Sequence, residues 1–229
     1  MAFAKADAAT AAGRENDAFI KFHYGVGNKF YKLFLDPEMQ YSCAYFPTGE
    51  ETPEEAQQAR LDMICRKLRL SEGDRFLDIV CSWGGLLRHA AKHYGVTALG
   101  ITLSPPQAEE ARARLQADGL SDRATVENAD YQDLEGQFDK IASVGMYEHI
   151  GLSNIPGYFS KILSLLDSDW LFLNHAISRG GKRKRTRFSK RPEQRALQKY
   201  IFPGGELDDI GHTVSEMETA KLEVHDVEG

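Results

Sequence analysis

The residues best suited to bind a ligand lie in one short stretch, Phe76-Leu77-Asp78-Ile79-Val80-Cys81-Ser82-Trp83-Gly84, which begins as an apolar run. This run reaches an acid, turns through small residues and opens a helical pattern at 86–91. Open α/β sheets use a strand, a tight turn and a helix N-terminus in this order to hold a nucleotide-like ligand. The turn therefore predicts a ligand site, with plain core packing as the alternative.

Glycines normally keep such a turn close to its ligand, and two of them are replaced in this chain. The usual version in methyltransferases reads Asp-x-Gly-x-Gly-x-Gly, but Val80 and Ser82 stand at the first two glycine positions and Gly84 alone remains. A valine there is expected to be forced into positive φ or into near-contact with the ligand, at a cost of about 1–3 kcal/mol. Because about 1.4 kcal/mol is a factor of ten, ligand binding is expected to weaken about ten- to a hundredfold.

Strand and helix patterns alternate around this turn. Strands are predicted at 75–79, 96–101, 124–128, 138–144 and 170–177, and helices at 84–94, 105–118 and 155–166. An earlier helix is predicted from Pro53 to about Leu70, because Thr52 and Glu55 form a capping box around that proline. This alternation with short connections predicts an α/β fold with a doubly wound, mostly parallel sheet.

The chain ahead of the sheet differs in character. Residues 1–18 are predicted to be disordered, and 19–72 to form an N-terminal helical lid segment with a short helix at 30–35 that Pro37 ends. Residues 73–229 are predicted to form the ligand-binding domain. Crowded aromatic residues at 39–46 could be packed core or could line a pocket for a cation or an acyl chain.

Composition narrows the class of protein. With 229 residues, of which 42% are apolar and 27% charged, the chain suits one sizeable globular domain. No apolar run approaches the roughly 18 residues of a membrane span, and the N-terminus lacks a secretory pattern, so a cytoplasmic location is expected. The cysteines are odd in number and widely spaced, which argues against a disulfide framework or a zinc site.

Charge is distributed unevenly along the chain. Residues 179–195 hold nine of the 28 Lys and Arg residues but one of the 34 acids. Such a run is usually a solvated loop. The alternative is attraction to an anionic surface, either phospholipid or nucleic acid.

The residues at the carboxyl ends of the predicted strands exclude several ligands. Thr102 stands where a dinucleotide site presents an acid, which argues against NAD, and no Gly-Lys-Ser/Thr phosphate loop is present. The fourth strand runs into Tyr147-Glu148-His149, where an amino-directed nucleic-acid methylase would show an Asn/Asp-Pro-Pro-aromatic turn. No nucleic-acid partner is therefore expected.

Taken together, these stretches resemble the cyclopropane fatty acid synthases and the related mycolic acid methyltransferases, over nearly the whole chain from His23 to Gly229. The motifs that carry the resemblance are His23-Tyr24-Gly25-Val26-Gly27-Asn28, Met39-Gln40-Tyr41-Ser42-Cys43-Ala44-Tyr45-Phe46, Ala56-Gln57-Gln58-Ala59, Thr102-Leu103-Ser104-Pro105-Pro106-Gln107, Ser143-Val144-Gly145-Met146-Tyr147-Glu148-His149-Ile150-Gly151 and Lys199-Tyr200-Ile201-Phe202-Pro203-Gly204-Gly205. Several motifs in the family's order are far more specific than a glycine pattern alone.

The resemblance implies a class I methyltransferase (Rossmann-like) fold that uses S-adenosylmethionine. The implied reaction is methylene transfer to the cis double bond of an unsaturated phospholipid acyl chain, with bicarbonate as the base and a cyclopropane fatty acid as the product. The catalytic residues implied are Cys43, Glu148, His175 and the backbone of Ile177. The cofactor contacts implied are Tyr41, Ser42, Asp78, Ile79, Cys81, Gly84, Thr102, Leu103, Gln107, Tyr131 and Gln132. The implied setting is the inner membrane face, where a peripheral protein meets its lipid at the bilayer surface as a monomer or a homodimer.

The chain also departs from the family beyond the cofactor turn. Trp170 stands where a family turn carries glycine, and the basic run at 179–195 replaces a less charged segment. Family members continue for roughly a hundred residues past Gly229, with a tyrosine that completes the bicarbonate site and helices that close over the acyl chain. The methyltransferase domain at 73–229 is therefore expected to be C-terminally truncated. The alternative function is a truncated, non-catalytic relative that at most binds cofactor or anionic lipid.

Overall fold

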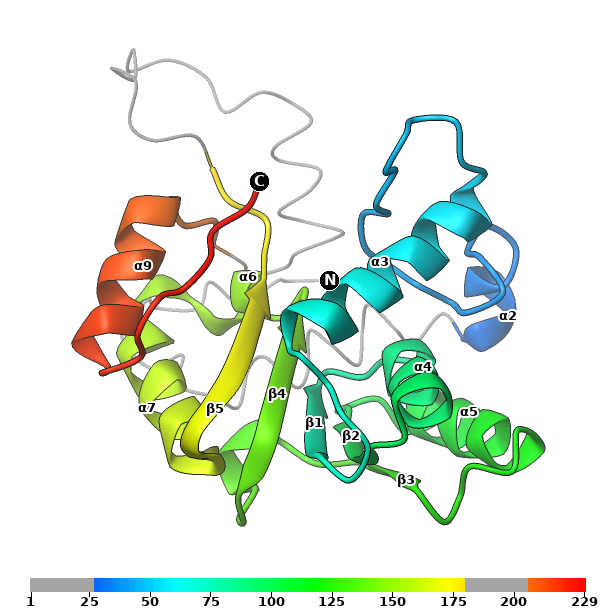
Figure 1. Cartoon of the computed structure of the whole chain (residues 1–229). Helices are drawn as coiled ribbons and strands as arrows, with labels where there is room; N and C mark the ends of the chain where they lie inside the picture. Colours follow the sequence, from blue (N-terminus) through cyan, green and yellow to red (C-terminus); the bar gives the residue numbers. More distant parts are fainter. Residues whose placement is uncertain (1–26, 180–205) are drawn as a thin grey trace, which may run out of the picture.

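A five-stranded parallel sheet forms the centre of the computed structural model, which describes residues 27–179 and 206–229. The strands run in the order β3-β2-β1-β4-β5 (Figure 1). Their bounds are β1 Arg75–Ile79, β2 Thr97–Ile101, β3 Ala124–Glu127, β4 Phe138–Val144 and β5 Leu166–His175. The predictions for residues 1–18, for most of the basic run and for the motifs at 23–26 and 199–205 lie outside the described residues.

Helices cover both faces of the sheet (Figure 1). One face carries α3 (Pro53–Lys67), α4 (Gly85–Tyr94) and α5 (Pro105–Ala117). The other carries α6 (Tyr147–Ile150), α7 (Ile155–Leu165) and α9 (Ile210–Thr219). The single turns η1 (Tyr131–Asp133) and η2 (Leu152–Asn154) lie between strands and helices, and α2 (Asn28–Tyr31) lies beside α5.

The central strand explains why the sheet is buried on both sides. Successive side chains of a strand point to opposite faces. Accordingly Phe76 packs into the core beneath α3, α4 and α5, whereas Leu77 and Ile79 pack into the core beneath α6 and α7. All three side chains are fully buried. A strand buried on both faces is typically a continuous apolar run, and the residues at 76–79 follow this pattern except for the buried Asp78.

The helix starts follow the predicted chemistry in part. The capping box before α3 is confirmed, because Thr52 Oγ1 accepts from the Glu55 N–H at 3.3 Å while Glu55 accepts from the Thr52 N–H at 2.8 Å. Ser104 occupies the N-cap of α5, but its side chain caps no N–H there. Its own N–H instead donates to Thr102 Oγ1.

Some predicted boundaries are wrong. The fifth strand begins at Leu166 and not at 170, because Leu166 is already extended (φ −87°, ψ 127°) and pairs with Phe138 across an irregularity in the β4–β5 register. The helix expected at 30–35 is the shorter α2, and α3 ends three residues before Leu70. At that end, Leu68 caps the helix and Arg69 turns the chain at φ 51°.

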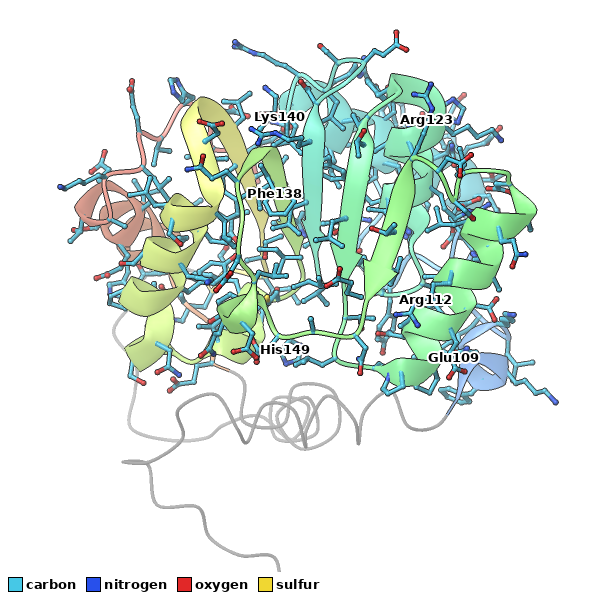
Figure 2. The ribbon with its side chains drawn as sticks, turned by 90° about the horizontal axis from the view of Figure 1, so that it is seen from below. Glu109, Arg112, Arg123, Phe138, Lys140 and His149 are labelled. Carbon is cyan, nitrogen blue, oxygen red and sulfur yellow. The ribbon has the colours of Figure 1, made fainter. Side chains whose placement is uncertain are left out.

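Because the strands are parallel, their amino ends meet at one edge of the sheet and their carboxyl ends at the opposite edge. Figure 2 shows His149 at the carboxyl edge and Lys140 and Arg123 toward the opposite edge. The carboxyl edge is where open α/β sheets bind ligands.

Within the described ranges, no helix is both long and apolar enough to cross a membrane.

Candidate functional site

The turn after β1 keeps a glycine-like backbone although two of its residues are not glycine. Val80 has φ 65° and Ser82 has φ 51°, so the predicted positive φ is confirmed. The turn is held by the Cys81 N–H, which donates to Ile101 O at 2.8 Å, and by the Gly84 N–H, which donates to Cys81 O at 2.8 Å. The hydrogen-bonded frame therefore outweighs the strain that a β-branched residue meets in this region.

Gly84 has a packing role in this turn. Its φ is 78°, and a Cβ placed on it would lie 3.1 Å from the Cβ of Ala111 in α5. The glycine thus lets the start of α4 approach α5 closely. Among the residues described, Gly84 lines neither of the two cavities at this edge of the sheet.

The larger of these cavities encloses about 790 Å³ of space, part of which is open to solvent. Six predicted cofactor contacts line it, namely Ile79, Thr102, Leu103, Gln107, Tyr131 and Gln132. Ala129, Asp130, Met146, His149, Ile150 and Asn154 complete much of its wall. The cavity therefore lies over the ends of β1, β2 and β4 and against η1.

One polar side chain of the larger cavity lacks a full set of partners. Thr102 Oγ1 donates to Gln107 Oε1 at 2.8 Å, and both side chains are buried. Gln107 Nε2 is also buried, and no described residue accepts its hydrogen bond. A buried donor without an acceptor is costly, so this amide suits a ligand that brings an acceptor such as a hydroxyl or a ring nitrogen.

The smaller cavity encloses about 500 Å³ of space and shares Val80 with the larger one. The predicted contacts Tyr41, Ser42, Asp78 and Cys81 line it, together with Met39, Gln40, Arg60, Ser82, Leu86 and Val144. Val80 and Gly145 line both cavities. A long ligand could therefore occupy both by passing the Val80 side chain.

The smaller cavity is lined by a buried acidic side chain, Asp78, and a buried basic side chain, Arg60. Asp78 is 3% exposed, and burial raises its pKa to about 8 although the nearby Arg60 charge acts to lower it. Arg60 is 2% exposed, and burial lowers its pKa. Sequence reasoning missed Arg60, although its spacing of four residues from the buried Ala56 and Ile64 placed it on the inner face of α3.

The four predicted catalytic residues come together in two pairs. The Ile177 N–H donates to Glu148 Oε1 at 2.5 Å, and Cys43 Sγ lies 3.4 Å from His175 Nε2. None of the four lines either cavity. Gly145 connects the two regions, because its N–H donates to His175 O at 2.9 Å while the residue borders both cavities.

Burial shifts the pKa of two of the predicted catalytic residues. It raises the pKa of Glu148 and lowers the pKa of His175, on which the Arg60 charge also acts. Glu148 Oε2 and His175 Nδ1 are both buried without a hydrogen-bond partner among the described residues. Each of these two atoms is therefore available for a hydrogen bond with a further polar group.

A segment from far along the chain supports α6. The Glu206 N–H donates to Glu148 O at 3.0 Å, and Tyr147 OH donates to Asp208 Oδ2 at 2.9 Å. His212 Nδ1 lies 2.7 Å from the same Asp208 oxygen. These contacts were not foreseen, because Asp208 lies in a stretch without regular periodicity and 61 residues from Tyr147. Tyr147 itself is buried in the core beneath α6 and α7.

Comparison with known proteins gives a consistent result. The family described as Mycolic acid cyclopropane synthetase matches residues 12–229. A probable fatty acid methyltransferase of Pseudomonas putida is 43% identical over 211 residues, which are 91% of this chain and 53% of that protein. The cyclopropane-fatty-acyl-phospholipid synthase of Escherichia coli (strain K12) is 43% identical over 190 residues, 83% of this chain and 47% of that protein. The chain thus spans about half the length of these relatives.

Solved structures show the same relationship. The mycolic acid cyclopropane synthase CmaA1, complexed with SAH and CTAB, superimposes with a TM-score of 0.81 at 31% identity. The match covers 89% of this chain and 74% of that one. The fold is that of the class I S-adenosylmethionine-dependent methyltransferases, and this chain belongs to the mycolic acid cyclopropane synthetase family.

Proposed function

We propose that this chain binds S-adenosylmethionine across the two cavities and transfers its methyl group to the cis double bond of an unsaturated phospholipid acyl chain, where loss of one proton to a base closes the ring of a cyclopropane fatty acid. The observation that carries the proposal is that the two cavities share two lining residues, Val80 and Gly145. Eleven cofactor contacts were predicted, and ten of them line one cavity or the other. Cyclopropane synthases and fatty acid methyltransferases among the relatives support the same reaction class.

The residues present suit this cofactor. Thr102, Leu103, Gln107, Tyr131 and Gln132 would hold its adenosine end, where the Gln107 amide still needs an acceptor. Tyr41, Ser42, Asp78 and Cys81 would hold its amino-acid end. When bound, the cofactor supplies an electrophilic methyl group on a sulfonium. The chain's own task is to orient that group and to keep water away from it.

We also propose that Cys43, Glu148 and His175 hold a bicarbonate ion. The buried, unpartnered Glu148 Oε2 and His175 Nδ1 fit such a small polar group. The Ile177 N–H is engaged with Glu148 Oε1, so its contribution would be to orient that carboxylate. The ion would supply a base. Glu148, whose pKa burial raises, could share a proton with it.

The substrate sets the expected surroundings. A phospholipid acyl chain is reached at a bilayer surface, so the proposed setting is the inner membrane face, with the chain as a peripheral protein that works as a monomer or a homodimer. The alternative is a non-catalytic relative that binds cofactor or anionic lipid without transferring the methyl group. The side chains of Val80 and Ser82 favour this alternative, because they add bulk where glycines would leave the cofactor room.

A lipid methylation assay separates the two functions. The chain would be incubated with methyl-labelled S-adenosylmethionine and vesicles of phosphatidylglycerol and phosphatidylethanolamine, with either cis-unsaturated or fully saturated chains. The proposal predicts label only in the unsaturated lipid, as an acyl chain one methylene heavier. Binding of S-adenosylhomocysteine with no label in either lipid would support the non-catalytic alternative.

A further inference from the structure

The mechanism above does not use Arg60, the buried cation of α3. Its side chain is 2% exposed and lines the smaller cavity. Its Nη1 donates to Gln40 Oε1 at 3.0 Å, and its Nε has no hydrogen-bond partner in the described part of the chain. Buried charges are normally paired, because removing a charge from water is costly. This guanidinium therefore points to a missing anion.

The surroundings hold Arg60 in place without neutralising it. Gln40, its hydrogen-bond partner, is itself fixed, since the Gln40 N–H donates to Asp36 Oδ1 at 2.6 Å and Gln40 Nε2 donates to Glu38 O. Asp78, Asp36 and Cys43 lie close enough to influence the charge of Arg60. Among the residues described, however, no carboxylate forms an ion pair with it.

The smaller cavity is also lined by a buried acidic group, the carboxyl of Asp78. Asp78 lines the same cavity as Arg60, is 3% exposed and accepts no hydrogen bond from any described residue. The cavity thus offers a fixed guanidinium and a carboxyl group, and Ser42 and Ser82 also line it. A ligand group that carries both a carboxylate and an ammonium would satisfy both residues at once.

We infer that Arg60 binds the carboxylate of the cofactor's amino-acid portion while Asp78 faces its ammonium group. This inference rests on the proposed function and assigns Arg60 as a specificity residue within it. The cavity then selects zwitterionic amino-acid tails, because a ligand without the carboxylate leaves the guanidinium buried and unpaired.

Three ligands test this assignment by calorimetric titration. S-adenosylhomocysteine carries both charged groups, its decarboxylated analogue keeps the ammonium, and methylthioadenosine has neither. The unmodified chain is expected to bind S-adenosylhomocysteine about ten- to a hundredfold more tightly than the decarboxylated analogue, as a lost charge-assisted hydrogen bond implies. This comparison needs no variant and so does not depend on how a variant folds.

Arg60→Met is expected to weaken S-adenosylhomocysteine binding by about the same factor and to leave the other two affinities within about threefold. Arg60→Lys should recover part of the loss. The matched control is Arg112→Met, since Arg112 lines neither cavity and donates to Val126 O (Figure 2). It should leave all three affinities unchanged.

Two outcomes overturn the inference while leaving the proposed function intact. Either the unmodified chain binds S-adenosylhomocysteine and its decarboxylated analogue equally well, or Arg60→Met weakens all three ligands by the same factor. If the unmodified chain binds none of the three ligands, the proposed function itself fails and the inference fails with it.

Discussion

The backbone N–H of Ile177 donates a hydrogen bond to Glu148 Oε1 and so joins the chain just after β5 to the short helix α6. The carboxylate is fixed on one side by this contact, while its second oxygen is buried without a partner among the described residues. The Glu206 N–H also fixes the backbone of Glu148 from the distant C-terminal segment. Glu148 is therefore an oriented carboxylate with one oxygen available for chemistry.

Glu148→Gln is expected to reduce methyl transfer to unsaturated lipid about a hundredfold or more, because an amide cannot exchange a proton with the base. Binding of S-adenosylhomocysteine should stay within about twofold, since Glu148 lines neither cavity. The exposed Glu135→Gln serves as the matched control. Full methyl transfer by Glu148→Gln would remove this residue from the catalytic group.

Val80→Gly is expected to tighten S-adenosylhomocysteine binding about tenfold, because the side chain that lies between the cavities disappears. The backbone already has φ 65° in the free chain, so relief of strain should appear in the free energy of unfolding and not in affinity. Arg69→Gly is the control, since Arg69 also has positive φ but lines neither cavity. Unchanged affinity in Val80→Gly would show that the valine does not obstruct the ligand.

Asn28→Ala is expected to destabilise the chain by about 1–2 kcal/mol and to weaken cofactor binding, as thermal melts and titration would show. Asn28 accepts from the Trp83 indole N–H at 2.8 Å and donates to Pro106 O at 2.9 Å. It thereby ties α2 to the cofactor turn and to the start of α5. Lys29→Ala, at the exposed neighbouring position, should change neither quantity. Equal behaviour of the two variants would contradict this bridging role.

The contact that Asp208 makes with Tyr147 of α6 and His212 of α9 is expected to depend on pH. A hydrogen bond to Asp208 raises the pKa of His212, so its stabilising contribution is complete below about pH 6.5 and is lost as the pH rises through the raised value. Burial opposes ionisation of Asp208, but hydrogen bonds from His212 and Tyr147 outweigh it and lower the pKa, so this contribution is lost in acid. The contact should be strongest between about pH 4 and 6.5.

Hydrogen exchange of the α9 amides, corrected for intrinsic rates, measures this dependence. Protection should fall between pH 6 and pH 8 in the unmodified chain, and His212→Gln should abolish that change. Glu216 and Asp209 also face His212 and add to its raised pKa, so they are kept in both proteins. The exposed His225→Gln is the matched control. An identical pH dependence in His212→Gln would exclude His212 as its source.

Much of the fold could be predicted because local patterns agree with the sheet that forms. The mostly apolar strand at 75–79, the capping box at Thr52 and the positive φ of Val80 all follow from residue type and near neighbours. The early start of β5 could not be predicted in this way. Leu166 reads as the end of a helix, and its pairing with Phe138 across the sheet decides that it is a strand residue.

The candidate site was predictable where it lies at strand ends and not where it depends on distant partners. Position after a strand pointed to Thr102 and Glu148. In contrast, Arg60 becomes a candidate site residue only because it lines a cavity, and Asp208 only because it accepts a hydrogen bond from Tyr147 in another element. Such pairings are set by tertiary packing, which a single sequence does not reveal.

The most direct test of the account is calorimetric titration of the unmodified chain with S-adenosylhomocysteine, alongside a Val80→Gly, Ser82→Gly double variant. The two cavities and their unpartnered polar groups predict binding of one ligand per chain in the micromolar range, and tighter binding by the double variant. Absence of binding by both proteins at millimolar ligand would contradict the claim that this edge of the sheet is a cofactor site.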